Sequence, residues 1–343
     1  MKKIRIGILA PSEIAYRRFL PSLKESDNIE YVGVAVASIK EWFGDTMDRD
    51  MSIIDNEYKK AQTFLINYGG IIFDGYENFI KSDLIDAIYI PLPPSLHFKW
   101  AKLALENNIH VLVEKPSTVD LAQTNELVAL AKENKLALHE NYMFVFHKQI
   151  DFIKDYLESG LLGEIRLVTI DFGFPFRGIN DFRYSKKLGG GALFDCGGYT
   201  IKLASLLLGR QMKIISAISS YKDNIDVDIF GSATLINDKG LIARVSFGMD
   251  NSYKCDIDVW GSKGKLYSNR ILTAPDDFKP IFNIVIDGNK SVKIIDSDST
   301  FKKSIEYFHE CILNENSRLE SYDSILNQSY LVDQFIRKAK VNM

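Results

Sequence analysis

The sequence has few cysteines, no excess of either charge and no long apolar run. Its three cysteines, Cys196, Cys255 and Cys311, lie far apart without a CxxC pair, which argues against a disulfide framework or a zinc site. Lysine and arginine (42) nearly balance aspartate and glutamate (45), so no basic field attracts nucleic acid. The apolar run Ile4–Ala10 contains Arg5 and is too short for a signal peptide or membrane span. These absences predict a soluble cytoplasmic protein that binds no metal, nucleic acid or membrane.

The composition is typical of a globular chain with two domains. The chain has 343 residues, of which 46% are hydrophobic and 25% are charged, enough for two cores. Over residues 1–141 short apolar runs alternate with amphipathic stretches, as in βαβ units around a parallel sheet. Over 142–343 long alternating strands indicate a mostly antiparallel sheet. We therefore predict an α/β Rossmann dinucleotide-binding domain followed by an α+β domain for substrate binding and oligomerisation.

The first domain is expected to contain five strands and three helices. The strands are predicted at Ile4–Ala10, Tyr31–Ser38, Ala87–Pro91, Ile109–Glu114 and Leu136–Glu140, and the helices at Glu13–Ser26, Ser95–Asn107 and Val119–Asn134. The segment 41–70 is longer than a βα turn and one helix require, which indicates an insertion. Its Phe43–Met51 part is interpreted as a variable surface loop, with a cofactor cover or a subunit contact as the alternatives.

The second domain is expected to expose one face of its sheet. Strands are predicted at Ile165–Phe174, Lys213–Tyr221, Val227–Asn237, Gly240–Met249 and Lys254–Gly261, and helices at Lys148–Ser159, Leu193–Leu208, Lys302–Leu313 and Tyr322–Lys338. Strands this long and apolar are unusual when one face is open to water. We therefore expect a homodimer or homotetramer formed through this sheet.

The turn after the first strand has the composition of a phosphate-binding turn. Gly7–Ala15 reads GILAPSEIA and keeps one glycine of the glycine-rich dinucleotide pattern. Ala10 and Ser12 are small enough for backbone N–H groups to approach a phosphate. The helix beginning at Glu13 and Ile14 adds its positive N-terminal end. An ordinary strand-to-helix turn is the alternative interpretation.

The residues after the second strand favour NADP over NAD. An NAD site places an acidic residue here to bind the ribose 2′-hydroxyl, whereas this chain has Ser38 and Lys40. A hydroxyl and a cation suit a 2′-phosphate. Because Glu41 is nearby, NAD remains an alternative cofactor. Lys40 is also compatible with a solvated surface lysine that binds no cofactor.

Two further strand ends point to the same edge of the sheet. Ile90–His97 reads IPLPPSLH, and its prolines form a rigid loop at the carboxyl edge, where ligands bind in such sheets. Leu92, Pro93 and His97 are therefore candidate cofactor contacts, although His97 is also compatible with a packing role. The next strand ends in Glu114, whose carboxyl group is a further cofactor candidate.

Lys115 follows Glu114 directly and is followed by a proline that fixes the turn. From this position its ammonium can project toward the cofactor edge, although a lone lysine is more often a surface residue.

A glycine-rich segment precedes the second group of candidates. Gly189–Gly191 permits a tight turn, and the predicted helix after it places Asp195 and Tyr199 four residues apart on one face. An acidic and a phenolic group would then project together. The alternative is that Asp195 caps the helix and Tyr199 packs in the core.

These motifs, in this order and spacing, resemble the glucose-fructose oxidoreductase/inositol dehydrogenase (Gfo/Idh/MocA) family over nearly the whole chain. The matching segments are GILAPSEIA at 7–15, YIPLPPSLH at 89–97, HVLVEKP at 110–116, SGLLGEIRLV at 159–168 and FRYSKKLGGGALFDCGGY at 182–199. The tyrosine at 199 is similar to the branch that contains nucleotide-sugar ketoreductases. IAYRRFLP at 14–21 resembles the opening of sugar 3-ketoreductases.

The resemblance implies roles for the candidate residues. Lys115 would lie beside the substrate and the nicotinamide, and Tyr199 would be the acid or base. Asp195 would bind a sugar hydroxyl or orient the lysine. Phe182 and Arg183 would lie near the nicotinamide, and Phe182 is also a candidate for contact with the substrate.

The expected reaction is hydride transfer between NADPH and a sugar carbonyl. Tyr199 would donate the proton, and because a free tyrosine has a pKa near ~10, the Lys115 ammonium would ease that transfer. The favoured substrate is a keto-sugar, nucleotide-linked, with Arg177 as a candidate for its diphosphate. The alternatives are oxidation of a free aldose or cyclic diol, and a non-catalytic sensor of NADP or sugar.

Overall fold

A computed structural model describes residues 3–46 and 49–342, and the chain divides into two compact units. Unit 1 comprises Met1–Asn141 and Phe301–Leu326, and unit 2 comprises Tyr142–Thr300 and Asn327–Met343. The sequence analysis assigned residues 301–326 to the second domain. They belong to unit 1 because the helices that they form pack against the rest of that unit. For example, the Tyr322 hydroxyl donates hydrogen bonds to the carbonyl oxygens of Ala131 and Leu136.

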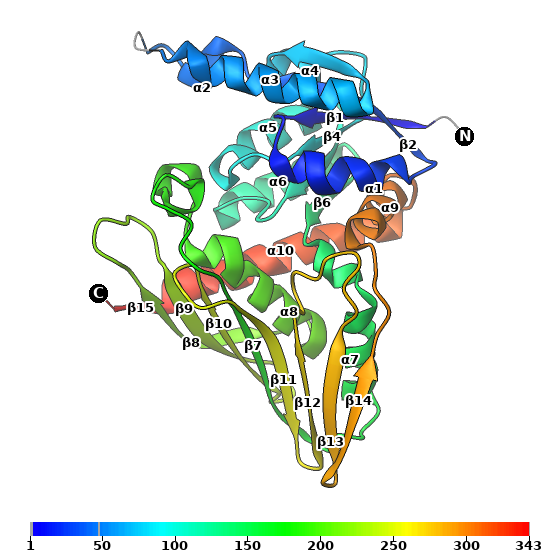
Figure 1. Cartoon of the computed structure of the whole chain (residues 1–343), viewed down its shortest axis with the longest axis vertical. Coiled ribbons are helices and arrows are strands. Elements are labelled where there is room, and N and C mark those ends of the chain that lie inside the picture. Colours follow the sequence, from blue (N-terminus) through cyan, green and yellow to red (C-terminus); the bar gives the residue numbers. More distant parts are fainter. Residues whose placement is uncertain (1–2, 47–48, 343) are drawn as a thin grey trace. The chain divides into compact units, whose positions relative to one another are not determined.

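Unit 1 is built on a six-stranded parallel sheet in the order β3-β2-β1-β4-β5-β6. Figure 1 labels β1, β2, β4 and β6 of this sheet. The strands are β1 (Ile4–Leu9), β2 (Ile29–Val36), β3 (Ile71–Asp74), β4 (Ala87–Ile90), β5 (His110–Glu114) and β6 (Leu138–Asn141). The predicted Rossmann-type α/β domain is confirmed. The sequence analysis missed β3, which has only four residues and directly follows the 41–70 segment that was interpreted as an insertion.

The segment 41–70 is mostly helical, so its interpretation as an insertion is wrong. The described part of the predicted Phe43–Met51 surface loop, residues 44–46 and 49–50, lies between two helices and is exposed, as predicted. After the short α2 (Ile39–Phe43), α3 (Met51–Tyr68) runs for 18 residues and leads into β3. Asp50 caps α3 by accepting a hydrogen bond from the Ser52 N–H. The segment is therefore the crossover between two parallel strands. Residues 47–48, within the predicted loop, lie outside the described residues.

Helices lie on both faces of the parallel sheet. They are the π-helical η1 (Ala15–Phe19), α1 (Leu20–Lys24), α4 (Tyr76–Ile80), α5 (Pro94–Glu106), α6 (Leu121–Glu133) and α9 (Thr300–Leu313). Successive strand residues point to opposite faces. In β4, Ile88 and Ile90 share a core with Trp100 of α5, whereas Tyr89 stacks on Phe19 of η1 at 4.1 Å. The sheet is therefore buried on both sides.

Unit 2 contains a nine-stranded sheet in the order β14-β13-β12-β11-β7-β10-β9-β8-β15. Its strands are β7 (Ile165–Gly173), β8 (Lys213–Ser220), β9 (Phe230–Ile236), β10 (Ile242–Gly248), β11 (Lys254–Gly261), β12 (Gly264–Asn269), β13 (Ile281–Ile286), β14 (Asn289–Ile294) and β15 (Ala339–Asn342). The β7–β10 and β8–β15 pairs are parallel and the other pairs are antiparallel. The predicted α+β domain with a mostly antiparallel sheet is confirmed.

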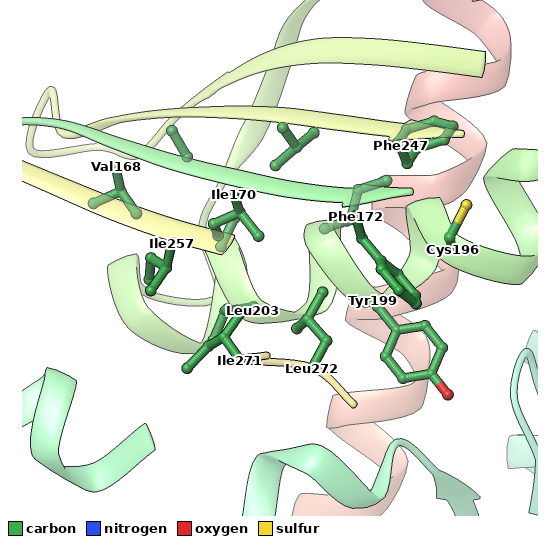
Figure 2. Packing of buried hydrophobic residues seen from close by; sticks show 14 of the residues in the cluster. Val168, Ile170, Phe172, Cys196, Tyr199, Leu203, Phe247, Ile257, Ile271 and Leu272 are labelled. Carbon is green, nitrogen blue, oxygen red and sulfur yellow. The ribbon is translucent and has the colours of Figure 1, made fainter. Parts of the chain in front are cut away.

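One face of this sheet carries the core of unit 2. Its helices include α7 (Lys148–Glu158), the π-helical η5 (Leu193–Gly197), α8 (Gly198–Leu208) and the C-terminal part of α10 (Glu315–Lys338), while η2 (Met143–Phe146), η3 (Phe182–Tyr184) and η4 (Lys186–Leu188) are 3-10 turns. Ile170 of β7, Phe247 of β10 and Leu203 of α8 belong to the buried cluster (Figure 2). No described helix is long and apolar enough to cross a membrane.

Candidate active site

The turn after β1 contains a residue in the left-handed region and a serine side chain bonded to the helix that follows. Ala10 adopts a φ of 74°, in the left-handed region, and its N–H donates to Ala35 O at 3.1 Å. Ser12 Oγ accepts a hydrogen bond from the Ala15 N–H at 3.2 Å. Packing requires glycine at position 7, because a Cβ there would lie 2.4 Å from the ring of Phe79. Glu13 and Ile14 begin the following helix, and Glu13 forms an exposed ion pair with Arg17.

Just after β2 lies Glu41, whose carboxylate already accepts hydrogen bonds from backbone N–H groups. Glu41 Oε2 accepts from the backbone N–H of Ser38 at 2.8 Å and of Tyr76 at 2.9 Å, and Oε1 accepts from Glu77 at 2.8 Å. The Glu41 carboxylate therefore caps the first turns of both α2 and α4. Lys40 is exposed, and no described carboxylate forms an ion pair with it.

His97 connects the two loops at the carboxyl edge of the sheet. Its ring is fully buried, with Nδ1 2.7 Å from Pro116 O and Nε2 2.7 Å from Leu92 O. Burial lowers the pKa of His97 to about 4, against the effect of both carbonyl groups. The neighbouring Pro93 precedes α5 and accepts a hydrogen bond from Leu96 N. His97 thus fixes the backbone from which the candidate cofactor residues project.

The turn that carries Lys115 is fixed on both sides. Glu114 Oε1 accepts hydrogen bonds from the Tyr89 hydroxyl and from Asn141 Nδ2, both at 2.6 Å. On the other side, Glu140 Oε1 accepts from the Ser117 N–H at 2.8 Å. Burial raises the pKa of Glu114, while its two donors and the Lys115 ammonium act in the opposite direction. The Lys115 backbone is therefore held at a defined place.

The glycines before η5 are required by close contacts. A Cβ at Gly190 would lie 2.3 Å from Arg183 O, and one at Gly191, where φ is 124°, would lie 2.4 Å from Asp228 Oδ1. The Asp228 carboxylate accepts the Leu193 N–H at 2.8 Å, and its backbone carbonyl accepts the Ala192 N–H at 2.8 Å. Asp228 therefore fixes the start of the helical segment that bears Asp195 and Tyr199.

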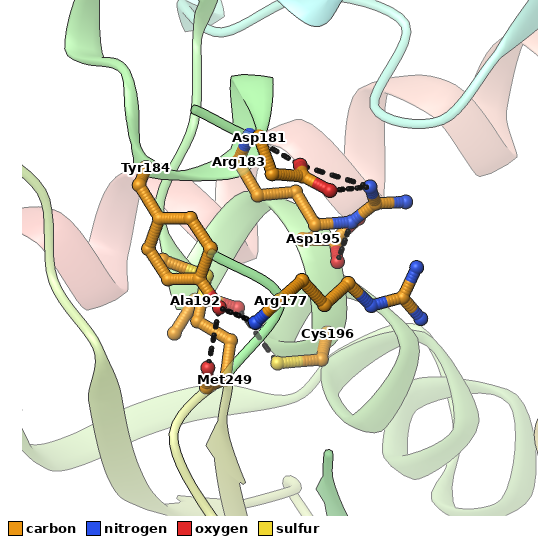
Figure 3. A network of polar contacts seen from close by, with 8 residues as sticks. All are labelled: Arg177, Asp181, Arg183, Tyr184, Ala192, Asp195, Cys196 and Met249. Carbon is orange, nitrogen blue, oxygen red and sulfur yellow. Dashed lines mark hydrogen bonds and ion pairs between the residues drawn. The ribbon is translucent and has the colours of Figure 1, made fainter. Parts of the chain in front are cut away.

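Asp195 lies in an ion-pair network (Figure 3). Arg183 Nε donates to Asp195 Oδ2 at 2.8 Å, and Arg183 Nη1 donates to Asp181 Oδ1 at 3.1 Å. Burial lowers the pKa of Arg183, but the two carboxylates outweigh this effect and raise it. The structure thus brings together Asp195 and Arg183, which the sequence analysis assigned to different roles. Phe182 packs its ring beneath Arg183, 4.6 Å from the guanidinium carbon.

Tyr199 lies at the edge of the unit 2 core. Its ring packs against Tyr142 at 5.2 Å and against Phe144 and Phe172 at 5.6 Å, and only 7% of the residue is exposed. In Figure 2 the phenolic oxygen points away from the labelled apolar residues. Because Leu193–Gly197 is π-helical, the helix before Tyr199 departs from the regular α-helix that the sequence analysis predicted.

Arg177 projects from the segment after β7. Its backbone N–H donates to the Tyr184 hydroxyl at 3.1 Å, and its guanidinium lies 4.6 Å from the centre of the Phe174 ring. In the part of the chain that the structure describes, no carboxylate pairs with it. Its guanidinium is therefore held by a ring face, and its positive charge is not neutralised by a described carboxylate.

Sequence analysis missed the residues that hold these groups, namely Tyr89, Glu140, Asn141, Asp181 and Asp228. Glu140 and Asn141 end a buried strand, and polar residues at that position favour a role at the carboxyl edge. Asp228 lies in a loop, where the sequence pattern gives no comparable indication.

A parallel dinucleotide-binding sheet combined with a large mixed sheet defines a two-domain nicotinamide-dependent oxidoreductase. Two family models match the chain, the oxidoreductase family with an NAD-binding Rossmann fold over residues 46–142 and the GFO/IDH/MocA C-terminal domain over 150–267. The chain belongs to the GFO/IDH/MocA family, and it is an NAD(P)-dependent oxidoreductase.

Relatives extend this similarity over nearly the whole chain. The dTDP-3,4-didehydro-2,6-dideoxy-alpha-D-glucose 3-reductase of Actinomadura kijaniata is 33% identical to this chain. The similarity covers 96% of this chain and 94% of that protein. The crystal structure of KijD10, a 3-ketoreductase from the same organism, with NADP and TDP-benzene has a TM-score of 0.90 over 99% of both chains at 33% identity. The NADP-dependent D-xylose 1-dehydrogenase 2 of Haloferax volcanii is 26% identical over 93% of this chain and 92% of its own.

Proposed function

We propose that this enzyme uses NADPH to reduce a ketone, at carbon 3, of a sugar linked to thymidine diphosphate. The observation that carries the proposal is the similarity to the 3-reductases, which continues over 96% of this chain. Three more proteins of that name, from Saccharopolyspora spinosa, Streptomyces violaceoruber and Streptomyces antibioticus, are 29–33% identical to it. The D-xylose dehydrogenase is more distant, so oxidation of a free sugar is the second candidate.

Lys115 and Tyr199 are proposed to act on the ketone oxygen. The bound nicotinamide supplies the hydride. The Lys115 ammonium donates a hydrogen bond to the oxygen as negative charge develops on it, and the Tyr199 hydroxyl donates the proton. Asp195 is proposed to bind a sugar hydroxyl with its carboxylate, while Arg183 holds that carboxylate in place.

Variants of KijD10 support this assignment. Structures of that enzyme were solved with one tyrosine changed to phenylalanine and with one lysine changed to alanine or glutamate. The interval along its sequence between that lysine and that tyrosine equals the interval between Lys115 and Tyr199. The same spacing favours the same pair of positions in this chain.

The preference for NADP is proposed to come from Ser38 and Lys40. An acidic group selects NAD by binding the ribose 2′-hydroxyl, but the Glu41 carboxylate already accepts three backbone N–H groups. A hydroxyl and an exposed ammonium then remain for a 2′-phosphate. The Ala10–Ser12 turn with Glu13 and Ile14, and the loop of Leu92 and Pro93, would bind the rest of the cofactor, with Gly7 and His97 holding these segments.

Arg177 is the proposed partner of the substrate diphosphate, because its guanidinium is exposed and lies on the Phe174 ring instead of pairing with a carboxylate. Phe182 would contact the sugar. Arg183 is less suited to the diphosphate, since Asp181 and Asp195 already neutralise it.

The exposed face of the nine-stranded sheet is the proposed surface for a homodimer or homotetramer. Trp260, Ile215 and Ile218 are 59%, 53% and 48% exposed. They share this face with a hollow of about 450 Å³ lined by both acidic and basic side chains. We assign the reaction to the cytoplasm, because the three cysteines are buried free thiols.

The test is NADPH oxidation by the purified protein with dTDP-linked 3-keto-sugars, the same sugars without the nucleotide, and D-xylose with NADP. Turnover confined to the nucleotide-linked ketones is the expected result. Turnover of D-xylose alone would replace the proposal with the second candidate. NADPH binding without turnover of any compound would point to a sensor.

A further inference from the structure

A buried side chain of α10 is bonded to the start of α8, where Tyr199 lies. Gln328 Nε2 donates to the backbone carbonyl oxygen of Gly198 at 2.8 Å and to the Tyr142 hydroxyl oxygen at 3.3 Å. Gln328 is 2% exposed. All of these residues belong to unit 2, although Gln328 follows Gly198 by 130 positions in the sequence. Gln328 thus contacts both the residue before Tyr199 and a residue whose ring packs against Tyr199.

The orientation of the Gln328 amide is determined by its partners. Because a backbone carbonyl oxygen can only accept a hydrogen bond, the amide nitrogen must face Gly198. The Tyr142 hydroxyl oxygen lies beside the same nitrogen and accepts from it. Gln328 Oε1 is buried and has no hydrogen-bond partner in the part of the chain that the structure describes. The side chain therefore makes both bonds as a donor, and a residue without a donor removes both of them.

The backbone that carries Tyr199 depends on contacts from outside its own helix. Gly197 and Gly198 are consecutive, and glycine restricts the backbone less than any other residue. The turn that ends at Gly197 is π-helical, a rare form that is common at functional sites. A Cβ at Gly198 would collide with the Tyr142 hydroxyl oxygen, so this hydroxyl lies directly against the Gly198 backbone. Gln328 and Tyr142 therefore supply the constraint that two glycines lack.

We propose that Gln328 is a positioning residue for Tyr199, and that it acts by holding Gly198 and Tyr142 together. The inference rests on the proposed role of Tyr199 as proton donor and adds the residue that keeps it in place. The bond to Gly198 fixes the backbone from which Tyr199 projects. The bond to Tyr142 fixes a ring that lies 5.2 Å from the Tyr199 ring, at an interplanar angle of 88°. A reacting group that is misplaced by about 1 Å can lose about a hundredfold in rate, so both bonds bear on the proton transfer.

The first measurement is ¹⁹F NMR of the protein labelled with 3-fluorotyrosine, in which the Tyr199 signal is assigned through Tyr199→Phe. Gln328→Met keeps the length of the side chain and removes its donor. The Tyr199 signal should shift and broaden in this variant, because the ring is no longer held in one position. An unchanged Tyr199 signal in Gln328→Met would overturn the inference.

Asn327→Leu is the matched control. Asn327 directly precedes Gln328 on α10, and its Nδ2 donates to Ser205 Oγ of α8 at 2.8 Å. Both substitutions remove an amide donor between the same two helices at nearly constant side-chain volume, so general loosening of α10 would affect both variants alike. Ser205 lies more than one helical turn beyond Tyr199, and the Tyr199 signal should stay unchanged in Asn327→Leu. Changes of the same size in the two variants would contradict a specific role for Gln328.

A second pair of variants tests the contact between Gly198 and Tyr142. Gly198→Ala should lower kcat about tenfold, because the added methyl group displaces the Tyr142 hydroxyl oxygen and with it the neighbouring Tyr199. Adding Tyr142→Phe removes that oxygen, and the nearest remaining atom, Cζ of residue 142, would lie at an ordinary contact distance of 3.4 Å. The double variant should therefore recover part of the lost kcat. A double variant no more active than Gly198→Ala would contradict the role given to this contact.

Turnover of Gln328→Met gives an independent measurement. Its kcat should fall about tenfold, as expected when a proton donor is displaced by a fraction of an ångström. Its KM for NADPH should be unchanged, because the residues proposed to bind the phosphates of the cofactor belong to unit 1. Asn327→Leu should leave both values unchanged, and a wild-type kcat in Gln328→Met would overturn the inference. If the wild-type enzyme reduces none of the ketones, the proposed function fails, while the ¹⁹F spectra still decide whether Gln328 holds Tyr199.

Discussion

Tyr199 is the residue whose hydroxyl the proposed chemistry uses directly, while its ring packs in an aromatic group. Tyr199→Phe keeps the ring and removes the proton donor. We expect kcat to fall at least a hundredfold, a typical loss for a general acid, with NADPH affinity and Tm unchanged. The control is Tyr142→Phe, which also removes a tyrosine hydroxyl from this aromatic group. The Tyr142 ring packs beside Tyr199, and its hydroxyl accepts a hydrogen bond from Gln328. A fall in kcat of the same size in Tyr199→Phe and Tyr142→Phe would contradict the assignment of Tyr199 as the proton donor.

Lys40 is the residue on which the proposed NADP preference can be tested. Lys40→Ala should weaken NADPH about fivefold to tenfold, as expected for a lost charge-assisted contact with a phosphate, and leave NADH binding unchanged. Fluorescence titration of both cofactors measures this difference. Lys81→Ala is the matched control, since Lys81 is paired with Glu77 at 2.5 Å. A similar loss for NADH and NADPH would show that Lys40 does not bind the 2′-phosphate.

The candidate residues differ in how far the sequence alone could reveal them. Lys115 and Tyr199 could be named as candidates, because a lysine between a strand end and a proline, and a tyrosine after a glycine turn, are local patterns. Their proposed roles came from the family resemblance. The partners of these residues were not predicted. Asn141 contacts Ser304, more than 160 positions away, and Asp228 contacts Leu193. Such contacts depend on which strands become neighbours, which no local pattern contains.

At the scale of elements, Asp228 caps the helical segment that precedes Tyr199. Burial raises the pKa of Asp228 from 3.8 to about 6. The folded chain therefore holds a proton that the unfolded chain releases, and this group's contribution to stability falls as pH rises from about 4 to about 6. Asp228→Asn keeps an acceptor for the Leu193 N–H without the charge. The Tm of this variant, measured by calorimetry, should rise relative to that of the wild type as pH increases from about 4 to about 6. A difference in Tm that stays constant over this pH range would contradict the raised pKa of Asp228.

His97 connects the Leu92 loop with the turn after Lys115. Burial lowers its pKa from 6.5 to about 4, so the stability that it contributes is present above pH 6.5 and lost as pH falls toward 4. His97→Gln should remove this dependence and, by loosening both loops, raise the Kd for NADPH about tenfold.

His110 provides the control for this substitution. Burial also lowers its pKa to about 4, but it lies at the amino end of β5, where Nδ1 accepts from the Ala137 N–H. His110→Gln should therefore change the pH dependence of Tm and leave NADPH binding unchanged. If both variants bind NADPH as wild type does, His97 has only a packing role.

Some elements with an apolar period were predicted, but several strands of the second domain were not. β12, β13 and β14 were all missed, although β13 alternates buried and exposed residues. α5 and β7 match the predictions within one residue at each end, because each has a buried face. β14 was missed, since all of its residues are exposed, and it exists because β13 provides a partner strand. The 41–70 segment was misread because α3 buries few residues, namely Ile54, Ala61 and Phe64.

At the scale of the whole molecule, the exposed face of the nine-stranded sheet is the surface to which we assign the proposed subunit contact. Its outward residues combine Trp260 with the Lys254–Asp171 ion pair and with Arg244 and Asp258. Opposite charges on one surface suit a two-fold contact, in which each copy presents the same surface to the other. A stable dimer of this kind buries about 800 Å² on each subunit.

Trp260→Lys should therefore break the assembly, because it removes the large exposed ring from the proposed contact and changes its balance of charges without disturbing the core. Trp260 is 59% exposed in the single chain, so the folded subunit should keep its Tm at high dilution. Light scattering should give two or four times the 39.0 kDa chain mass for wild type and the chain mass for the variant. Ile66→Lys is the control, since Ile66 is 80% exposed on α3 in unit 1 and should leave the assembly intact. A wild-type protein that is monomeric at micromolar concentration, or a Trp260→Lys variant with the same mass as wild type, would show that this face is not the subunit contact.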